Sequence, residues 1–254
     1  MLKISPQNSK TKGLREVPAL EGYLANRRKI YSLDLLSGHT CPGAKDCLAK
    51  VMEVAGKFTL VDGPDTLFRC FSASQEICYP NVRRARTYNT GIIKRLKSAK
   101  QICNSILESL PKNLGVLRYH VGGDFFKLSY LQAAVMVAEA MPDRLFYAYT
   151  KSLHHLDRLD CQDLSQGLIR PNFLVTTSRG GRYDSLIEPL NVRTATVVFN
   201  EDQAGGMPID HDDSHAATIG GSFALLLHGV QPAGSEASKA LVQLRGKGSY
   251  GKRR

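Results

Sequence analysis

The chain has 254 residues, 43% hydrophobic and 22% charged, a composition typical of a globular protein with one or two domains. It carries 34 Lys and Arg against 23 Asp and Glu, a net charge of +11, and no apolar run approaches the roughly 18 residues of a membrane span. Residues 1–20 lack the apolar core of a secretory signal. Composition therefore disfavours a membrane or secreted protein, and we expect a cytoplasmic one.

Six apolar runs of strand length follow one another along the chain. Because they are nearly continuous rather than alternating, they favour a parallel sheet covered on both faces. Helical periodicity separates some of them, which indicates an α/β fold. The predicted strands cover residues 29–38, 114–126, 144–151, 172–178, 194–200 and 222–229, and the predicted helices cover 92–110, 129–141 with Ser129 as N-cap, and 235–246.

The order of these elements predicts one α/β domain over residues 29–254, preceded by an irregular lead-in over residues 1–28. Six units suit either a partial TIM-like (β/α)6 barrel or an open doubly wound sheet, and periodicity does not choose between them. Polar, glycine-rich or cysteine-rich stretches come directly after the strands. In parallel α/β folds the functional loops lie at the carboxyl ends of the strands, so we expect the reactive residues on one rim.

Four of the six cysteines fall in the loop 39–80: Cys41, Cys47, Cys70 and Cys78. A reducing compartment and a chain long enough to form a core both disfavour disulfides. Structural zinc sites usually have cysteines two to four residues apart, a spacing that is absent here. A cluster held by three cysteines leaves one iron open for a small molecule, and Cys41, Cys47 and Cys70 could supply the three thiolates.

The remaining cysteines are less informative. Cys78 could be a fourth ligand, which would make the cluster structural or redox-only, or it could be a packed thiol. Cys103 lies on the apolar face of a predicted helix and indicates an ordinary buried thiol. Cys161 is unassigned, and buried thiols throughout remain the alternative to a cluster.

The segment "HVGGDFF" ends the second predicted strand with Gly122, Gly123 and Asp124. Two glycines let the backbone approach a ligand closely, and the carboxylate can accept a hydrogen bond from an ammonium or a ribose hydroxyl. A tight turn with a capping aspartate explains the same residues. Lys151, Arg179 and His228 follow later strands and are further rim candidates, although each alone also suits a structural role.

Two other segments support different functions. Carboxylates and imidazoles gather at residues 210–215 and could bind a divalent metal in a hydrolase or nuclease, or form a solvated loop; they are Asp210, His211, Asp212, Asp213 and His215. Seven basic residues and no acid lie between Arg83 and Lys100, and the tail 245–254 is also basic. These charges favour a nucleic acid or nucleotide partner, and a solvated helix face with a frayed tail is the alternative.

Six blocks in order resemble the gene product 88 family of phages and plasmids: "TCPGAKDC", "FRCFSASQE", "LRYHVGGDFF", "FYAYTKS", "IDHDDSHA" and "FALLLHGVQPAGS". The resemblance runs from about residue 30 to residue 250. It implies a phage or plasmid origin and the cytoplasm of the host cell, and it points to no particular reaction.

The architecture is also similar to the radical S-adenosylmethionine (SAM) enzymes, which use six β/α units in a partial barrel. In them, three cysteines after the first strand hold a [4Fe–4S] cluster, and a Gly-Gly-Glu turn after the second contacts SAM. The resemblance implies cluster ligation by Cys41, Cys47 and Cys70, and SAM contact by Gly122, Gly123 and Asp124.

The same resemblance implies an opening lined by Tyr149, Lys151, Ser178, Arg179 and His228, an external electron donor, and a substrate that could be a nucleic acid or nucleotide. The chain departs from the family pattern in two places. The usual C-x3-C-x2-C loop is replaced by C-x5-C with a third cysteine 23 positions on, and Asp stands where Glu is usual.

Overall fold

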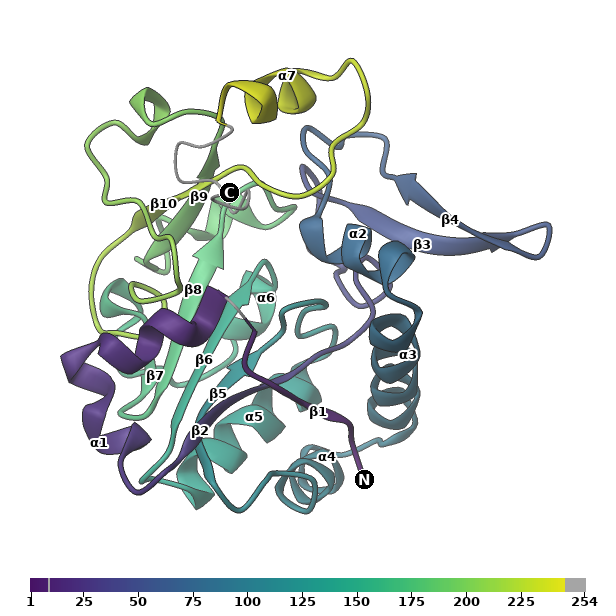
Figure 1. Ribbon diagram of the computed structural model, residues 1–254. Coiled ribbons are helices and arrows are strands. Elements are labelled where there is room, and N and C mark those ends of the chain that lie inside the picture. Colours follow the sequence, from purple (N-terminus) through teal and green to yellow (C-terminus); the bar gives the residue numbers. More distant parts are fainter. Residues whose placement is uncertain (9, 245–254) are drawn as a thin grey trace.

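The computed structural model describes residues 1–8 and 10–244 and shows a mixed α/β fold with a mostly parallel central sheet (Figure 1). The main strand order is β1-β2-β5-β6-β8-β9-β10; β1 runs antiparallel to β2, and β7 pairs antiparallel with β8. The six strands from β2 to β10 on this path are parallel and lie in chain order. The prediction of an α/β fold with a parallel sheet is confirmed. Among the described strands β1 and β10 are edges, and no pairing closes a barrel.

The six predicted parallel strands are all present, somewhat shorter than expected. The strands are β1 (Ile4–Pro6), β2 (Lys29–Leu33), β3 (Ala49–Val54), β4 (Lys57–Asp62), β5 (Leu114–Tyr119), β6 (Leu145–Thr150), β7 (Leu168–Arg170), β8 (Phe173–Ser178), β9 (Thr194–Val198) and β10 (Phe223–Leu226). The α-helices are α1 (Glu21–Leu24), α2 (Phe71–Cys78), α3 (Pro80–Arg95), α4 (Ala99–Leu107), α5 (Leu128–Ala140), α6 (Leu153–Leu156) and α7 (Glu236–Gln243). Short 3-10 helices include η1 (Lys10–Glu16) and η2 (Pro18–Leu20).

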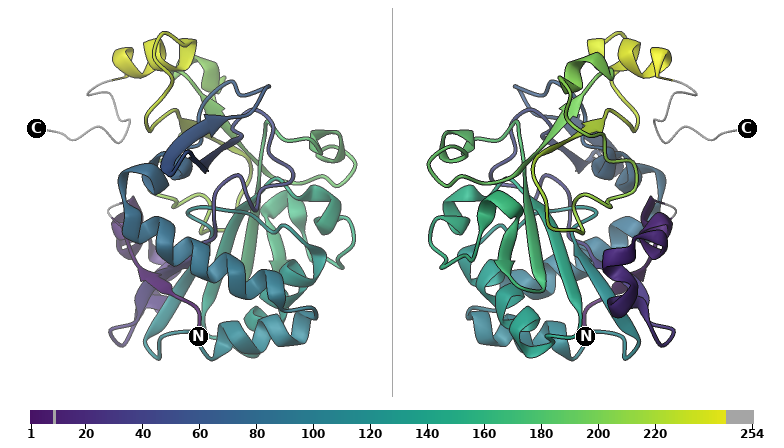
Figure 2. Two further views of the ribbon diagram at one scale, coloured as in Figure 1. Left: turned by 90° about the vertical axis from the view of Figure 1, so that its right-hand side faces the viewer. Right: turned by 90° about the vertical axis from the view of Figure 1, so that its left-hand side faces the viewer.

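Both faces of the sheet are buried, which explains why its strands read as continuous apolar runs. On one face, Leu117 and Phe146 pack in the same core as side chains of α4 and α5. On the other face, Val116 and Leu145 pack against Leu14 of η1 and neighbouring residues. Figure 2 shows α3 and α4 crossing in front of the sheet in the left-hand view.

Residues 1–28 are more regular than the expected lead-in. β1 pairs with β2, and the 3-10 helices bury Leu14 and Leu20 completely or nearly so against the sheet. Short 3-10 turns lack the four-residue periodicity used to predict helices, which is why sequence reasoning did not find them.

The helix predicted over residues 92–110 is in fact two helices, α3 and α4. Ser98 ends the run, because its hydroxyl accepts a hydrogen bond from the Gln101 amide while the Gln101 side chain accepts one from the Ser98 amide, a capping box that starts α4. α5 begins after Lys127 rather than at the predicted Ser129, and no side chain caps it. Ser235 caps α7 near the predicted start at residue 235, and that predicted helix extends to residue 246, beyond the described residues.

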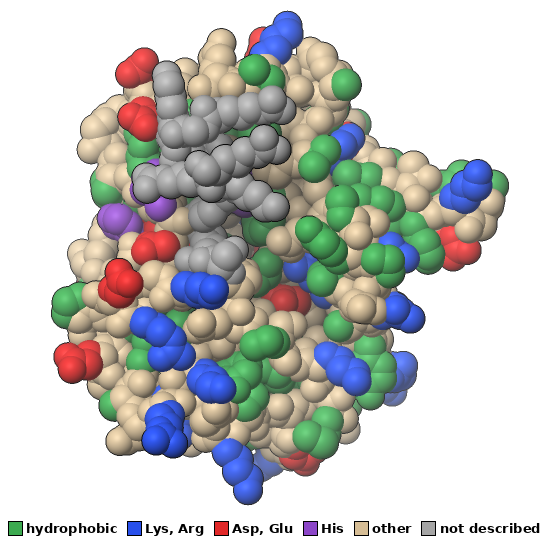
Figure 3. Space-filling model, in the orientation of Figure 1, with side chains coloured by type: hydrophobic (Ala, Val, Ile, Leu, Met, Phe, Trp, Pro, Cys, Tyr) green, Lys and Arg blue, Asp and Glu red, His purple; other side chains and the backbone are tan. Residues whose placement is uncertain are grey.

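The antiparallel hairpin β3–β4 was not predicted and projects from the body of the molecule (Figure 1). Val54, Phe58 and Val61 on it are exposed, and Figure 3 shows hydrophobic side chains gathered over this region. The hairpin lies in the chain between Cys47 and Cys70, so it brings two distant parts of the cysteine loop back together. Within residues 1–8 and 10–244, no helix is long and apolar enough to cross a bilayer.

Candidate functional site

A cavity of about 170 Å³ lies at the carboxyl ends of the parallel strands. It receives residues from the loops after β2, β5, β6 and β10 and from the start of α2. Ten of the residues singled out from the sequence line it: Cys41, Cys47, Cys70, Gly122, Gly123, Asp124, Tyr149, Lys151, Ser178 and His228.

The loop that carries Cys41 and Cys47 is fastened to the loops after β6 and β8. Ala44 and Gly181 form an isolated β-bridge, and the Asp46 amide donates to the Gly180 carbonyl (3.0 Å). Gly43 packs against the Lys151 backbone so closely that a Cβ there would lie 2.4 Å from the carbonyl oxygen. These backbone contacts hold both cysteines at the mouth of the sheet.

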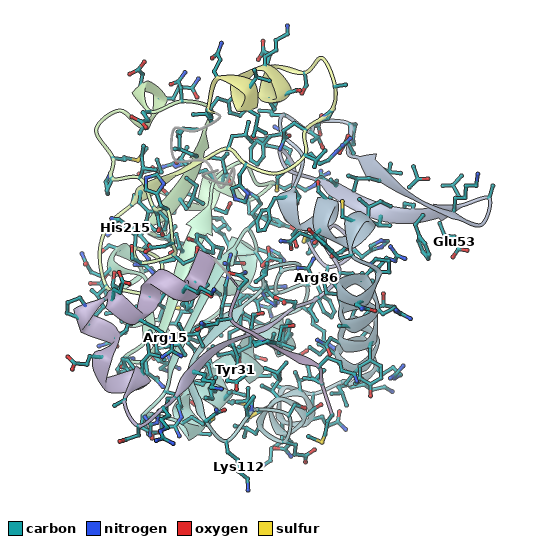
Figure 4. All side chains as sticks on the ribbon, viewed as in Figure 1. Arg15, Tyr31, Glu53, Arg86, Lys112 and His215 are labelled. Atoms are coloured by element: carbon teal, nitrogen blue, oxygen red, sulfur yellow. The ribbon has the colours of Figure 1, made fainter. Side chains whose placement is uncertain are left out.

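Cys70 reaches the same cavity from α2, whose first residue follows it. A buried ion pair fixes this helix: Arg86 Nη1 lies 2.9 Å from Glu76 Oε1 and donates to Ser72 Oγ (2.7 Å). Glu76 Oε1 also accepts from the Ser37 amide (2.9 Å) in the loop after β2. Figure 4 labels Arg86 next to α2 and α3. The ion pair therefore sets Cys70 against the loop of Cys41.

Backbone amides point at two of the three sulfurs. The Gly38 amide donates to Cys41 Sγ (3.4 Å), and the amides of Ser72 and Ala73 donate to the Cys70 thiol at the start of α2. Amides at a helix N-terminus favour negative charge, so these contacts stabilise thiolates.

Burial works against ionisation of the same thiols. It raises the pKa of Cys47 to about 11, although the nearby Lys151 charge lowers that pKa. Burial also raises the pKa of Cys41, helped by the Asp124 carboxylate and then by Cys70, and it raises the pKa of Cys70. The charges of the three thiols also affect one another's pKa, and all three residues line the same cavity. A bound metal would overcome the effect of burial, because it deprotonates a coordinating thiol outright.

Among the described residues, no group of three or more His, Cys, Asp or Glu side chains could hold a metal ion. One tetrahedral ion with bonds of about 2.3 Å needs its thiolates about 3.8 Å apart. In a cluster each thiolate binds a different iron, so the sulfurs spread further. The three thiols and the amides facing two of them fit the donor chemistry of such a cluster.

The other cysteines lie elsewhere. Cys78 is exposed at the end of α2 and does not line the cavity. Cys103 is buried in α4, as predicted, and Cys161 packs partly buried against the same core. Cys78 is therefore not placed with the three cavity cysteines.

The glycines of "HVGGDFF" are explained by protein packing. A Cβ on Gly122 would lie 2.4 Å from Ser72 Oγ and 2.7 Å from the Arg86 guanidinium. Gly123 has φ +95° and packs against Leu35 and Thr40, so a side chain there meets both strain and crowding. Both residues still border the cavity.

The Asp124 carboxylate is buried and already accepts three hydrogen bonds. Its donors are Thr150 Oγ1 (2.6 Å), the Lys151 amide (2.9 Å) and its own neighbour, the Phe125 amide (2.7 Å). Burial raises its pKa, while these hydrogen bonds lower it. Asp124 thus ties the end of β5 to the end of β6 and places negative charge near Cys41 and Cys47.

The remaining rim candidates divide into two groups. Lys151 is buried in the cavity wall, where its ammonium donates to the Ser178 carbonyl (2.8 Å), to Ser178 Oγ (3.1 Å) and to the Arg179 carbonyl. The His228 ring lies 4.4 Å from the Phe71 ring, beside Cys70. Arg179 does not line the cavity; its side chain is exposed and pairs with Glu188 at 3.7 Å.

The acidic segment 210–215 turns its buried carboxylates into the protein. Asp213 lies 2.5 Å from Arg118 Nη1 and accepts from Tyr147 Oη (3.0 Å) and Tyr149 Oη (3.3 Å). Asp210 accepts from the Asp212 amide (3.1 Å) and the Ala216 amide (3.4 Å). These contacts account for the burial of Asp210 and Asp213.

Sequence reasoning missed Arg118 and an apolar wall that includes Phe68, Val197, Leu225 and Leu227. Arg118 had a usable signal, since it is a charged residue within the continuous apolar strand "LGVLRY". The apolar wall had none, because its residues are indistinguishable from core residues in the sequence.

A family model described as Gene product 88 matches residues 2–245. No curated protein matches the chain. No solved structure matches it either.

Proposed function

The chain belongs to the gene product 88 family, and we propose that it is an iron–sulfur enzyme of the radical SAM type, with its cluster at the cavity rim. The observation that carries the proposal is the convergence of Cys41, Cys47 and Cys70 on one cavity at the carboxyl ends of six parallel strands in chain order. That strand order is also what a six-unit partial barrel requires, with β2 as its first strand.

In this proposal Cys41, Cys47 and Cys70 would hold a [4Fe–4S] cluster. With an external donor supplying one electron, the bound cluster supplies the reductive cleavage of SAM. The chain's own residues orient and shield the ligands. Gly122 and Gly123 border the cavity with their backbone. Asp124 Oδ2 accepts only the Lys151 amide among the described residues, so it offers an acceptor to an ammonium.

The surrounding residues also suit a dry reaction site. Phe68, Val197, Leu225 and Leu227 form an apolar wall opposite the polar residues of the rim. Tyr149, Ser178 and His228 line the same space, and Lys151 carries a positive charge next to Cys47. Apolar side chains exclude water from a reaction site, and this protects reactive species from side reactions.

The test begins with purification without oxygen. We expect a brown protein with about four irons and four sulfides per chain, which cleaves SAM to methionine and 5′-deoxyadenosine when dithionite is added. Cys41→Ala, Cys47→Ala and Cys70→Ala should each abolish iron binding. Cys78→Ala is the matched control and should retain it. A colourless protein that binds only zinc, or iron retained in the three cavity variants, contradicts the proposal.

A second candidate, nucleic-acid binding, is favoured by the exposed side of α3. Arg84, Tyr88 and Arg95 share one face because four and seven residues separate them, and all three are exposed. Next to this face the Arg83 guanidinium lies 3.6 Å from the centre of the exposed Phe58 ring. Cations beside accessible aromatic rings suit phosphates and stacked bases. The basic tail 245–254 lies outside the described residues.

Fluorescence anisotropy with a labelled oligonucleotide tests this second candidate. Binding should weaken with salt, and the Arg84→Glu and Arg95→Glu double variant should flatten the slope of log K against log salt by about 0.7 per lost phosphate contact on a single strand. Lys112→Glu is the control, because Lys112 is exposed at a different end of the molecule (Figure 4). Equal slopes in both variants exclude α3 as the binding face.

A further inference from the structure

Three deeply buried arginines differ in how their donors are used. Arg193 donates to the carbonyls of Val175 (3.1 Å), Thr218 (2.6 Å) and Ala216 (2.8 Å). Arg86 donates to Ser72 and Glu76. Arg118 is 4% exposed, yet within the described part of the chain its Nε has no hydrogen-bond partner.

The contacts of Arg118 neutralise its charge but do not provide acceptors for all of its N–H donors. Nη1 lies 2.5 Å from Asp213, and the guanidinium lies 5.4 Å from the centre of the Tyr149 ring. Nη1 is occupied by the Asp213 carboxylate, whereas Nε has no hydrogen-bond partner among the described residues. An arginine has five N–H donors in a planar fork, and a buried donor without an acceptor destabilises the folded protein. A bound ligand with an acceptor atom could satisfy the remaining donors of Arg118.

The position of Arg118 indicates that the acceptor would belong to a ligand in the cavity. On β5, Arg118 lies between Ser32 of β2 and Tyr147 of β6, and its side chain lines the cavity. Lys151 lines the cavity too, but its ammonium is occupied by Ser178 and Arg179, so it adds charge without offering free hydrogen bonds. Arg69 also lines the cavity, but its guanidinium is paired with Asp62 (2.5 Å). Arg118 is thus the cation best placed to receive an oxyanion.

Apolar side chains in the same cavity limit the rest of the ligand. Phe68, Val197, Leu225 and Leu227 present hydrocarbon to the same space. We propose that Arg118 is the recognition residue for an oxyanion, carboxylate or phosphate, on a small substrate whose remaining part is apolar. The inference rests on the proposed function, because it assumes that the oxyanion is part of the substrate of the proposed enzyme. SAM itself carries a carboxylate, so the experiment must separate the two sources.

Binding is measured by calorimetry with inorganic phosphate, with hexanoate, and with hexanamide as the uncharged match for hexanoate. We expect phosphate or hexanoate to bind and hexanamide to bind at least tenfold more weakly. Arg118→Lys keeps the pairing with Asp213 but loses the fork, and should weaken oxyanion binding at least tenfold. If Arg118→Lys does not fold, the Arg118→Gln and Asp213→Asn double variant, which removes both buried charges, gives the same comparison.

The inference is overturned if neither anion binds the wild-type protein, or if the folded Arg118 variant binds them equally well. It is also overturned if Arg118→Lys weakens SAM but not decarboxylated SAM, because Arg118 would then serve the cofactor. Repeating the titration on a Cys41→Ala protein separates the two hypotheses. Oxyanion binding that persists without iron supports Arg118 recognition whether or not the cluster proposal holds.

Discussion

The cysteine loop and the acidic segment 210–215 both carry side chains that bind metals, and the structure uses them in opposite ways. Cys41 and Cys47 face a cavity, and backbone amides or a nearby cation accompany the thiols. Asp210 and Asp213 are buried and accept hydrogen bonds from tyrosines and backbone amides. The difference teaches that residue type alone does not identify a site. What matters is whether the ligating atoms remain available after the protein's own donors are satisfied.

The largest expected effect belongs to the acidic segment. Asp213→Asn should lower the free energy of unfolding by about 3–5 kcal/mol, because it leaves the Arg118 charge buried without its partner. Asn tolerates the left-handed backbone at this position (φ 69°), so the loss reports the charge. Urea unfolding measures it. Asp212→Asn leaves an Oδ1 that can still accept from the Ser214 amide, so it should cost less than about 1 kcal/mol, and equal losses would remove the contrast.

A smaller effect is expected at the turn beside the cysteines. Gly122→Ala should cost about 1–3 kcal/mol, because the added Cβ meets Ser72 and Arg86 and displaces α2. Gly22→Ala is the matched control, since a Cβ there meets nothing within 4 Å, and in α1 it should be neutral or stabilising by up to about 1 kcal/mol. Thermal unfolding of both variants checks this. If Gly122→Ala is also neutral, the packing explanation of this glycine is wrong.

His120, which directly follows β5, should make the free energy of unfolding depend on pH. Burial lowers the pKa of His120 to about 3, so the folded protein keeps it neutral while the unfolded chain protonates it near pH 6.5. Stability should therefore fall as the pH drops below about 6.5, by up to about 1.4 kcal/mol per pH unit for this residue. Burial also lowers the pKa of His155 to about 4, which adds to the slope.

Urea unfolding from about pH 7 to about pH 5 tests this origin of the slope. His120→Asn should reduce the pH slope by about one proton, because Asn accepts the left-handed backbone of this position (φ 68°) without titrating. An unchanged slope would assign the dependence to other groups.

The smallest effect concerns the thiols of metal-free protein. Iodoacetamide should modify the exposed Cys78 first and the three cavity cysteines at least about tenfold more slowly, because these are only partly exposed and desolvation raises their pKa. Peptide mass spectrometry after short exposures gives the order. Cavity cysteines that react as fast as Cys78 would mean that the cavity opens readily to solvent.

The parts of the fold that sequence could predict are those where one signal dominates. The six parallel strands were found because burial on both faces makes them continuous apolar runs. The rule that loops follow strand ends brought together Cys41, Gly122 and Lys151, which are far apart in the chain. No local signal distinguished the 3-10 helices around Leu14, and the capping box at Ser98 was overlooked inside a longer apolar pattern.

The site was less predictable than the fold. Arg179 follows a strand like the other rim residues, but its side chain turns outward to Glu188. The direction of a side chain at a strand end depends on the last residue of regular pairing, which sequence locates only within a few residues. The lack of an acceptor for an Arg118 donor depends on the positions of all neighbouring groups, and no sequence pattern indicates it.

The hairpin β3–β4 occupies most of the chain between Cys47 and Cys70, and its two strands run out and back side by side. Adding or deleting one residue from each strand would lengthen or shorten the projecting end and leave the base in place. The count of residues between these two cysteines is therefore free to drift in steps of two while the thiols stay where they are. A search for related sites that relies on fixed cysteine spacing would lose them, whereas one that allows an insertion of variable length after Cys47 would find them.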